Sequence, residues 1–230
     1  MIVTIHQPEH LPWLGFFNKI DQADLLVLLD VVQFRKGYFQ NRNRILGPRG
    51  PLWLVVPVLL KGHMERTLRD MEIHNGKDWR RKHWKTIQHA YGRHPHFPRY
   101  ESALADLYRS EWRLLVELNA AIIRTFLGFL GIDTKIMWAS ELEVQGSRSE
   151  LLVSICRATG ASAYLSGPTG REYLDESSFQ EQGIEVLYHA FDHPGYQQHG
   201  SPAFVPNLST LDLLCNCGPE SLDVIRSGTA

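Results

Sequence analysis

The chain has 230 residues, with 24 Lys and Arg against 25 Asp and Glu, and a formal net charge of −1. This length suits a single domain over residues 1–230, and the near-neutral charge argues against nucleic acid or a membrane surface as a partner. No apolar stretch reaches the roughly 18 residues that span a bilayer, and no signal peptide precedes the first predicted strand, so we expect a cytoplasmic protein. Cys156, Cys215 and Cys217 match neither a disulfide framework nor a metal pattern.

The first thirty residues predict a strand, a helix and a second strand. Ile2-Val3-Thr4-Ile5 is a β-branched run typical of a buried strand, and His6-Gln7-Pro8 breaks it. Apolar positions at helical spacing follow, and a second apolar run ends at Asp30. In open α/β sheets, ligands bind beyond the carboxyl ends of the strands. His6, Gln7 and Asp30 are therefore the first candidates for a site.

Residues 31–58 predict a binding segment followed by a third buried strand. Amide and guanidinium groups alternate with aromatic rings over residues 31–44, which is unusual for a plain surface loop. Gln33 lies close behind Asp30, and Asn41-Arg42-Asn43 places a planar bidentate donor between two amides, suited to phosphate or carboxylate. A structural clamp within the loop explains the same residues equally well. A turn at 48–51 precedes the apolar run 52–58, in which Pro57 indicates an end or an edge.

Residues 75–131 are expected to form a helical segment within the domain. Apolar residues recur at helical spacing over 79–91, and Pro95 and Pro98 separate this helix from a shorter one at 101–109. A second apolar stripe over 114–129 predicts a long buried helix that ends at Gly131. The first helix is basic, a pattern more typical of a solvated surface, although Arg80, Arg81 and Lys85 can dock an acidic carrier protein.

The rest of the chain predicts strands that alternate with helices. Apolar runs at 132–138, 161–165 and 184–191 are typical of strands. Ser147 and Glu150 have the spacing of a capping box before a helix that stops at Gly160. Ser166 and Gly167, with Gly170 beyond them, form a small-residue loop that allows a ligand to approach the backbone. This order predicts an α/β fold with a mostly parallel, Rossmann-like (HUP/nucleotidyltransferase-like) sheet flanked by helices, with a helical insertion.

Several motifs together resemble the WbqC-like family. They are the run from His6 to Gly15, the stretch from Asp30 to Gln33, Asn41-Arg42-Asn43, Tyr164-Leu165-Ser166-Gly167, and Pro206-Asn207-Leu208-Ser209 followed by Asp212-Leu213-Leu214. The resemblance covers nearly the whole chain. It implies a biosynthetic enzyme that handles a modified sugar or a small amine. It also adds Tyr173, Gln197, Asn207, Ser209 and Asp212 as site candidates, any of which can instead be a structural hydrogen-bonding residue.

A weaker similarity links the chain to nucleotidyltransferases that open with a strand, a two-histidine turn and a helix. Here His6 and His10 are four residues apart, and the glycine that lets the backbone approach phosphate in that family is missing. This similarity therefore supports the fold more than the activity.

From these residues we expect a transferase that forms an amide. His6 is predicted to deprotonate an attacking amine, and Asp30 to orient the base or the ammonium group. The donor is expected to be a thioester of CoA or of an acyl carrier protein, with no cofactor and no metal. The predicted substrate-binding residues are Gln7, Gln33, Asn41, Arg42, Asn43, Ser166, Gly167, Tyr173, Gln197, Asn207, Ser209 and Asp212. Two alternatives stay open: a nucleotidyltransferase or ATP-dependent ligase with a nucleotide at the first strand end, and a non-catalytic sugar-binding module.

Overall fold

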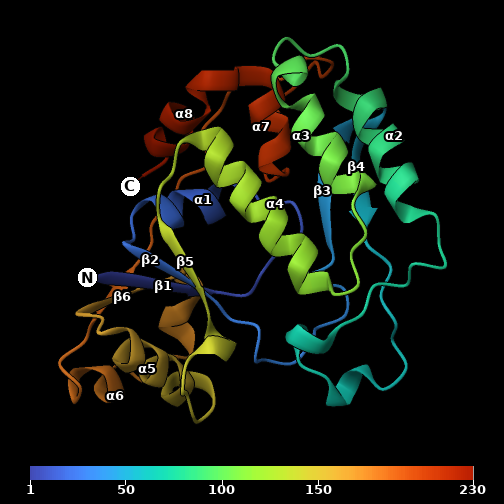
Figure 1. The fold of residues 1–230 in the computed structure, drawn as a ribbon. Helices are drawn as coiled ribbons and strands as arrows, with labels where there is room; N and C mark the ends of the chain where they lie inside the picture. Colours follow the sequence, from blue (N-terminus) through green and yellow to red (C-terminus); the bar gives the residue numbers. More distant parts are fainter. Residues whose placement is uncertain (230) are drawn as a thin grey trace.

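A parallel sheet forms the centre of the molecule (Figure 1). In the computed structural model, which describes residues 1–229 apart from the side chain of His63, its strands in spatial order are β5 (Lys135–Trp138), β2 (Leu25–Leu28), β1 (Ile2–His6), β6 (Ala163–Ser166) and β7 (Glu185–Tyr188). Each strand pairs with its neighbours in parallel. From β1 the chain adds β2 and then β5 on one side, and it afterwards adds β6 and β7 on the other side of β1. The strand order therefore reverses between β1 and β6. The predicted Rossmann-like α/β fold is confirmed.

Helices cover both faces of this sheet. Because side chains alternate along a strand, Val27 in β2 contributes to one face and Leu28 to the other. The face of Val27 packs against α5 (Arg148–Thr159) and α6 (Glu176–Gln180). The face of Leu28 packs against α1 (Leu14–Asp21) and α4 (Leu115–Leu130), and Figure 1 shows these two pairs of helices on opposite sides of the strands.

A second group of elements extends the core beside α4. It consists of α2 (Trp79–Tyr91), α3 (Phe97–Arg109), α7 (Thr210–Cys217) and α8 (Ser221–Ser227), together with β3 (Arg42–Gly47) and β4 (Gly50–Val55). Buried side chains of these elements form one continuous apolar cluster with α1 and α4. The helical segment expected within residues 75–131 corresponds to α2, α3 and α4.

The expected third strand at 52–58 is wrong in its place and its burial. β4 pairs antiparallel with β3 in a separate two-stranded sheet, and Trp53 and Val55 are both about 45% exposed. The hairpin closes through Gly50, whose φ of 108° favours glycine, so the apolar run turns back on the preceding residues rather than joining the parallel sheet. The residues read as a binding loop at 41–43 thus begin a strand.

Two helix starts also differ from expectation. Pro98 does not end a helix but lies in the first turn of α3, where its missing N–H costs nothing. The capping box expected at Ser147 does not form, since its side chain makes no capping hydrogen bond to α5. The helix ends agree with expectation: Gly131 and Gly160 both have left-handed backbone at the C-caps of α4 and α5.

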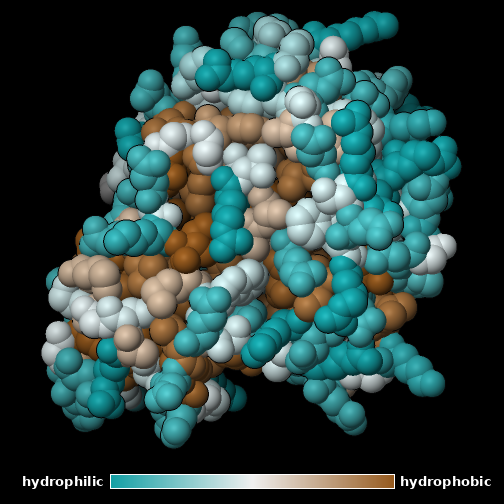
Figure 2. Space-filling view, in the orientation of Figure 1, coloured by the Kyte–Doolittle hydropathy of each residue, from teal (hydrophilic) through white to brown (hydrophobic). Residues whose placement is uncertain are grey.

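The surface around α4 is partly apolar. Figure 2 shows hydrophobic residues gathered over the region of α4 and β5, bounded by hydrophilic residues on this face. None of the helices within residues 1–229 combines the length and the apolar character needed to cross a bilayer.

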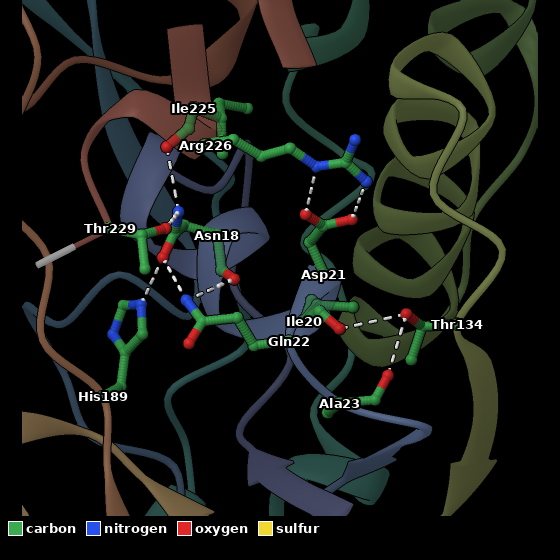
Figure 3. A network of polar contacts seen from close by, with 10 residues as sticks. All are labelled: Asn18, Ile20, Asp21, Gln22, Ala23, Thr134, His189, Ile225, Arg226 and Thr229. Carbon is green, nitrogen blue, oxygen red and sulfur yellow. Dashed lines mark hydrogen bonds and ion pairs between the residues drawn. The ribbon is translucent and has the colours of Figure 1, made fainter. Parts of the chain in front are cut away.

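A polar network fixes α1 against α8 (Figure 3). Asn18 donates from Nδ2 to the carbonyl of Ile225 (2.9 Å) and to Thr229 Oγ1 (3.0 Å). Its Oδ1 accepts from Gln22 and from His189 Nε2, both at 2.7 Å. One buried amide therefore joins α1, the residue after β7 and residues 225–229.

Candidate functional site

A cavity of about 480 Å³ lies at the carboxyl ends of β1 and β6, where the strand order reverses. Its walls come from β1 and the loop after it, from α1, from the segment after β2, from the start of α5, and from β6 with the turn that follows. The lining residues are Ile5, His6, Gln7, Glu9, Lys19, Leu29, Val32, Arg35, Tyr38, Arg148, Leu151, Leu152, Tyr164, Gly167, Thr169 and Tyr173. This is the position at which open α/β sheets bind ligands.

A larger hollow of about 680 Å³ is less suited to chemistry. It is lined by Val58, Leu59, Leu60, Lys61, Gly62, Arg66 and His74, a set dominated by aliphatic side chains and backbone. We therefore take the cavity at β1 and β6 as the candidate site, because polar side chains from several elements converge there.

His6 lies at the end of β1, with its ring edge-on to Phe16 of α1 at a centroid distance of 4.8 Å. Its Nδ1 is 2.9 Å from the carbonyl oxygen of Gln7, which can only accept, so Nδ1 carries the hydrogen. Nε2 is then left with a lone pair. Burial, with a smaller contribution from the charge of Lys19, lowers the pKa of His6 to about 3, so the ring is neutral at pH 7.

Glu9 and Lys19 line the same cavity, and the charge of each side chain shifts the pKa of the other. Burial raises the pKa of Glu9 to about 7, although the positive charge of Lys19 opposes this rise. Burial lowers the pKa of Lys19 to about 8, opposed by Glu9. Among the described residues, Glu9 Oε2 is buried without a hydrogen-bond partner, and no ion pair joins the two side chains. Both groups are thus poised to titrate near neutral pH.

The remaining polar walls are cationic and aromatic. Arg35 lies over the ring of Tyr38, with Cζ 4.1 Å from the ring centroid. Arg148 begins α5, and Tyr173, which is 61% exposed, closes the side formed by the turn after β6. Gln7 also lines the cavity, and its side-chain carbonyl accepts a hydrogen bond from Gln40.

Asp30 does not share the cavity with His6. Its carboxylate, 2% exposed, accepts hydrogen bonds from Ser140 N (3.0 Å) and Ser140 Oγ (2.6 Å). These contacts tie the end of β2 to the turn after β5. Asp30 is not among the residues that line the cavity, so the expectation that it orients His6 or a substrate amine there does not agree with this geometry.

The amides and the guanidinium group expected to bind substrate are used within the fold. Asn41 donates to Val56 O and Asn43 to Leu11 O, both at 2.8 Å. Arg42 donates to the carbonyl of Gly37 and lies over the Trp53 ring, with Cζ 4.4 Å from its centroid. These contacts agree with the alternative interpretation of the three residues as a structural clamp. None of the three is among the residues that line the candidate site.

Gln33 is also placed elsewhere. It is exposed, and its side chain donates to the carbonyl of Met64 at 2.7 Å. Ser166 is buried and donates to Gly167 O (3.2 Å), while the backbone of Gly170 packs closely on its side chain. Of this loop, Gly167 reaches the cavity.

Of the residues added by the family resemblance, Tyr173 lines the cavity and the others lie apart from it. Asn207 donates its N–H to His193 Nε2 (3.2 Å), and Ser209 caps α7 by accepting from Leu211 N (3.2 Å). Gln197 is exposed on the segment before α7. Asp212 accepts hydrogen bonds from three side chains, those of Tyr91, Tyr196 and Gln198. These contacts hold α7 and the segment before it in place.

Sequence reasoning missed Glu9, Lys19 and Arg148, and it placed Arg35 in the predicted binding segment without naming it as a site residue. One signal was available for Lys19, because it falls three residues after Phe16 on the apolar stripe of α1, where a buried cation is unusual. Nothing comparable distinguished Glu9 or Arg148, since each lies in a loop or helix start whose direction depends on distant contacts. Among the side chains that the structure describes, which exclude that of His63, no three His, Cys, Asp or Glu residues are grouped so as to hold a metal ion.

The family model described as the WbqC-like protein family matches residues 7–224. The chain belongs to the WbqC-like family. It is also 34% identical over 227 residues to the uncharacterized protein Rv1507c of Mycobacterium tuberculosis, an alignment that covers 97% of each protein. No solved structure matches. The opening motif of this WbqC-like chain, His6 to Gly15, supplies His6, Gln7 and Glu9 to the cavity, so the resemblance on sequence and the candidate site meet in the same segment.

Proposed function

We propose that this WbqC-like protein is a biosynthetic transferase that forms an amide by transferring an acyl or aminoacyl group from a thioester to an amine. The amine belongs to an amino sugar or another small metabolite, and the thioester to CoA or an acyl carrier protein. The observation that carries the proposal is an unpartnered carboxyl group, Glu9, whose pKa of about 7 is matched to proton transfer at neutral pH, beside a neutral His6.

The proton transfer is assigned to Glu9 rather than to His6. A base works best when its pKa lies near the operating pH. Burial raises the pKa of Glu9 to that range, whereas it lowers the pKa of His6 well below it. His6 keeps a different role, because its free Nε2 can accept one N–H of the amine and so direct the nitrogen lone pair.

The reaction then balances as follows. The amine nitrogen attacks the thioester carbonyl carbon, the C–N bond forms, and Glu9 takes the proton that the nitrogen releases. The C–S bond breaks as the tetrahedral intermediate collapses, and the thiolate leaves with a proton, returned from Glu9 or taken from water. The products are one amide and one thiol.

The direct test is incubation of the protein with a panel of acyl and aminoacyl thioesters and amino-sugar nucleotides, followed by mass spectrometry. We expect a new amide for at least one pair. We expect kcat/KM to fall as the pH drops below about 7, because Glu9 must be ionised to accept the proton.

The matched variants are Glu9→Gln and Glu143→Gln. Glu9→Gln should lower kcat by roughly a hundredfold or more, whereas Glu143 is exposed and outside the cavity, so its variant should keep full activity. The absence of any amide across the panel, or full activity of folded Glu9→Gln, would contradict the proposal.

A second function is favoured by the position of the cavity at the reversal of strand order, where many α/β proteins bind nucleotides. A nucleotidyltransferase or ATP-dependent ligase would use the same cavity for a nucleoside triphosphate. Release of pyrophosphate on addition of a triphosphate and Mg²⁺, without thioester consumption, would select this function over amide transfer from a thioester.

A further inference from the structure

Positive charge predominates in the cavity at β1 and β6. Within residues 1–229, three cationic side chains line it, Lys19, Arg35 and Arg148, against one acid, Glu9. Among those residues, none of the three cations forms an ion pair. His6 adds no charge because its ring is neutral at pH 7. The cavity therefore keeps an excess of positive charge even when Glu9 is ionised.

Lys19 is the most unusual of these cations. It lies in α1, is 4% exposed, and forms no hydrogen bond or ion pair through its ammonium group among the described residues. Burying an ammonium group without a partner is unfavourable, so such groups normally meet a carboxylate, a carbonyl or a ligand. Because Lys19 lines the cavity, a ligand can reach it there.

The start of α5 adds uncharged donors to the same wall. Ser147 gives no side-chain cap, and the N–H groups of Arg148, Ser149 and Glu150 have no acceptor among the described residues. The N-terminus of a helix of this length, 12 residues, carries a partial positive charge directed along these N–H groups. Arg148, the first residue of α5, extends its guanidinium charge over the same place.

We propose that the cavity binds the phosphate groups of a phosphorylated substrate, held between the ammonium group of Lys19 at its inner end and Arg35, Arg148 and the N-terminus of α5 at its opening. This rests on the proposed function in one respect, namely that the cavity is the substrate site. A diphosphate is the best match, because its charge balances several cations at once and its oxygens accept the paired N–H groups of arginine.

The test is isothermal titration calorimetry of the whole protein with three probes: inorganic pyrophosphate, uridine diphosphate and coenzyme A. We expect pyrophosphate to bind and the preferred organic probe to bind more tightly. If uridine diphosphate is preferred, the phosphate belongs to a nucleotide-linked acceptor. If coenzyme A is preferred, it belongs to the donor.

Three variants assign the contacts. Lys19→Met and Arg148→Gln should each raise the Kd for pyrophosphate by roughly tenfold or more. The control is Arg124→Gln, because Arg124 is an exposed arginine on α4 outside the cavity, and its Kd should be unchanged. Since Arg148 is exposed, its variant tests the proposal even if Lys19→Met does not fold.

A pH series separates a direct role of Lys19 from a structural one. The pKa of Lys19 is about 8, so the unaltered protein should lose pyrophosphate affinity relative to Lys19→Met as the pH rises above 8. A merely structural lysine would leave the two pH profiles parallel.

The outcomes for this inference and for the proposed function are distinct. Binding of pyrophosphate without amide formation keeps the phosphate site and rejects the transferase. Amide formation from unphosphorylated substrates, with no pyrophosphate binding and with an unchanged KM in Arg148→Gln, rejects the phosphate site and keeps the transferase.

Discussion

Three acids in this protein, Asp30, Asp212 and the half-buried Glu9, share the same carboxyl chemistry but have different surroundings. Asp30 is satisfied by Ser140, and Asp212 by two tyrosines and a glutamine, so both hold segments together. Glu9 instead keeps one oxygen without a partner and lines the cavity. The hydrogen-bond partners of an acid, rather than its position at the end of a strand, therefore separate a structural carboxylate from one available to a substrate.

Asp30→Ala tests this separation. The substitution leaves the N–H and the hydroxyl of Ser140 without their acceptor, so we expect the free energy of unfolding to fall by about 1–3 kcal/mol. Urea denaturation measures that loss. Because Asp30 does not line the cavity, the Kd for pyrophosphate should stay within a factor of two. A large increase of this Kd in a variant that remains folded would show that Asp30 takes part in binding.

His6 and Gln7, which the sequence predicted as site residues, line the cavity, since their place after a β-branched run determines where they lie. It did not separate Asp30 from Glu9. The partner of Asp30 is 110 residues away, and no local pattern encodes a contact over that separation. The same reason applies to Asn43, whose side chain reaches Leu11 across 32 residues.

Among the elements, α1 has the greatest influence on the site, because it supplies Lys19 and the ring of Phe16 that packs on His6. Its orientation depends on Asn18, which uses both its donor and its acceptor to join residues 189 and 225–229 (Figure 3). Arg226 adds two hydrogen bonds to Asp21 at 2.7 and 2.9 Å. The position of Lys19 is thus set from the opposite end of the chain.

Asn18→Ala should therefore act on stability and on the site together. It removes the side-chain partner of Ile225 O and of His189, and it leaves Gln22 only its longer hydrogen bond to the backbone carbonyl of residue 18, so we expect a loss of about 2–4 kcal/mol in the free energy of unfolding. Chemical denaturation measures this loss, and titration with pyrophosphate should show weaker binding in the folded variant. Gln22→Ala is the control, since it removes a single partner of Asn18 and should cost less than about 1 kcal/mol. Equal losses for the two variants would contradict the central role of Asn18.

Elements with strong periodicity were predicted well from the sequence, among them β1, β2, α2 and α4. β3 was not, because a half-buried strand in a two-stranded sheet and a binding loop share the same mixture of polar and aromatic residues. The strand expected at 52–58 exists as β4, but its antiparallel pairing with β3 and its exposed face were not predicted. The helices α7 and α8 were not anticipated either, although Ser209 provides the expected type of N-cap for α7.

For the whole molecule, buried histidines make stability depend on pH. Burial lowers the pKa of His6 and His10 to about 3 and that of His83 and His189 to about 4. The unfolded chain takes up these protons near the ordinary histidine value of about 6.5, so it binds more protons than the folded state below that pH. Stability is therefore retained above pH 6.5 and lost as the pH falls toward 4. The raised pKa of Glu9 opposes this trend by one proton.

His10→Leu should reduce that loss. Each histidine contributes up to about 1.4 kcal/mol per pH unit to the slope, and His10 is buried with neither ring nitrogen hydrogen-bonded among the described residues. Urea denaturation at pH 7, 6 and 5 should show a shallower slope for this variant than for the unaltered protein. His89→Gln is the control, because His89 is exposed on α2. A slope that does not change in His10→Leu would show that this ring titrates freely in the folded protein.

The central pairing of β1 with β6 joins Ile2 to Ala163, and it has a consequence for how the protein matures during translation. Contacts between such distant parts of a chain form late, because a long loop must close before any pairing compensates for the lost entropy. A ribosome will have made the first forty residues, with His6, Glu9 and Lys19, long before their counterparts on β6 and α5 emerge. The walls of the cavity therefore come together only after the chain has been made as far as Tyr173, and a nascent chain that ends before α5 lacks this cavity.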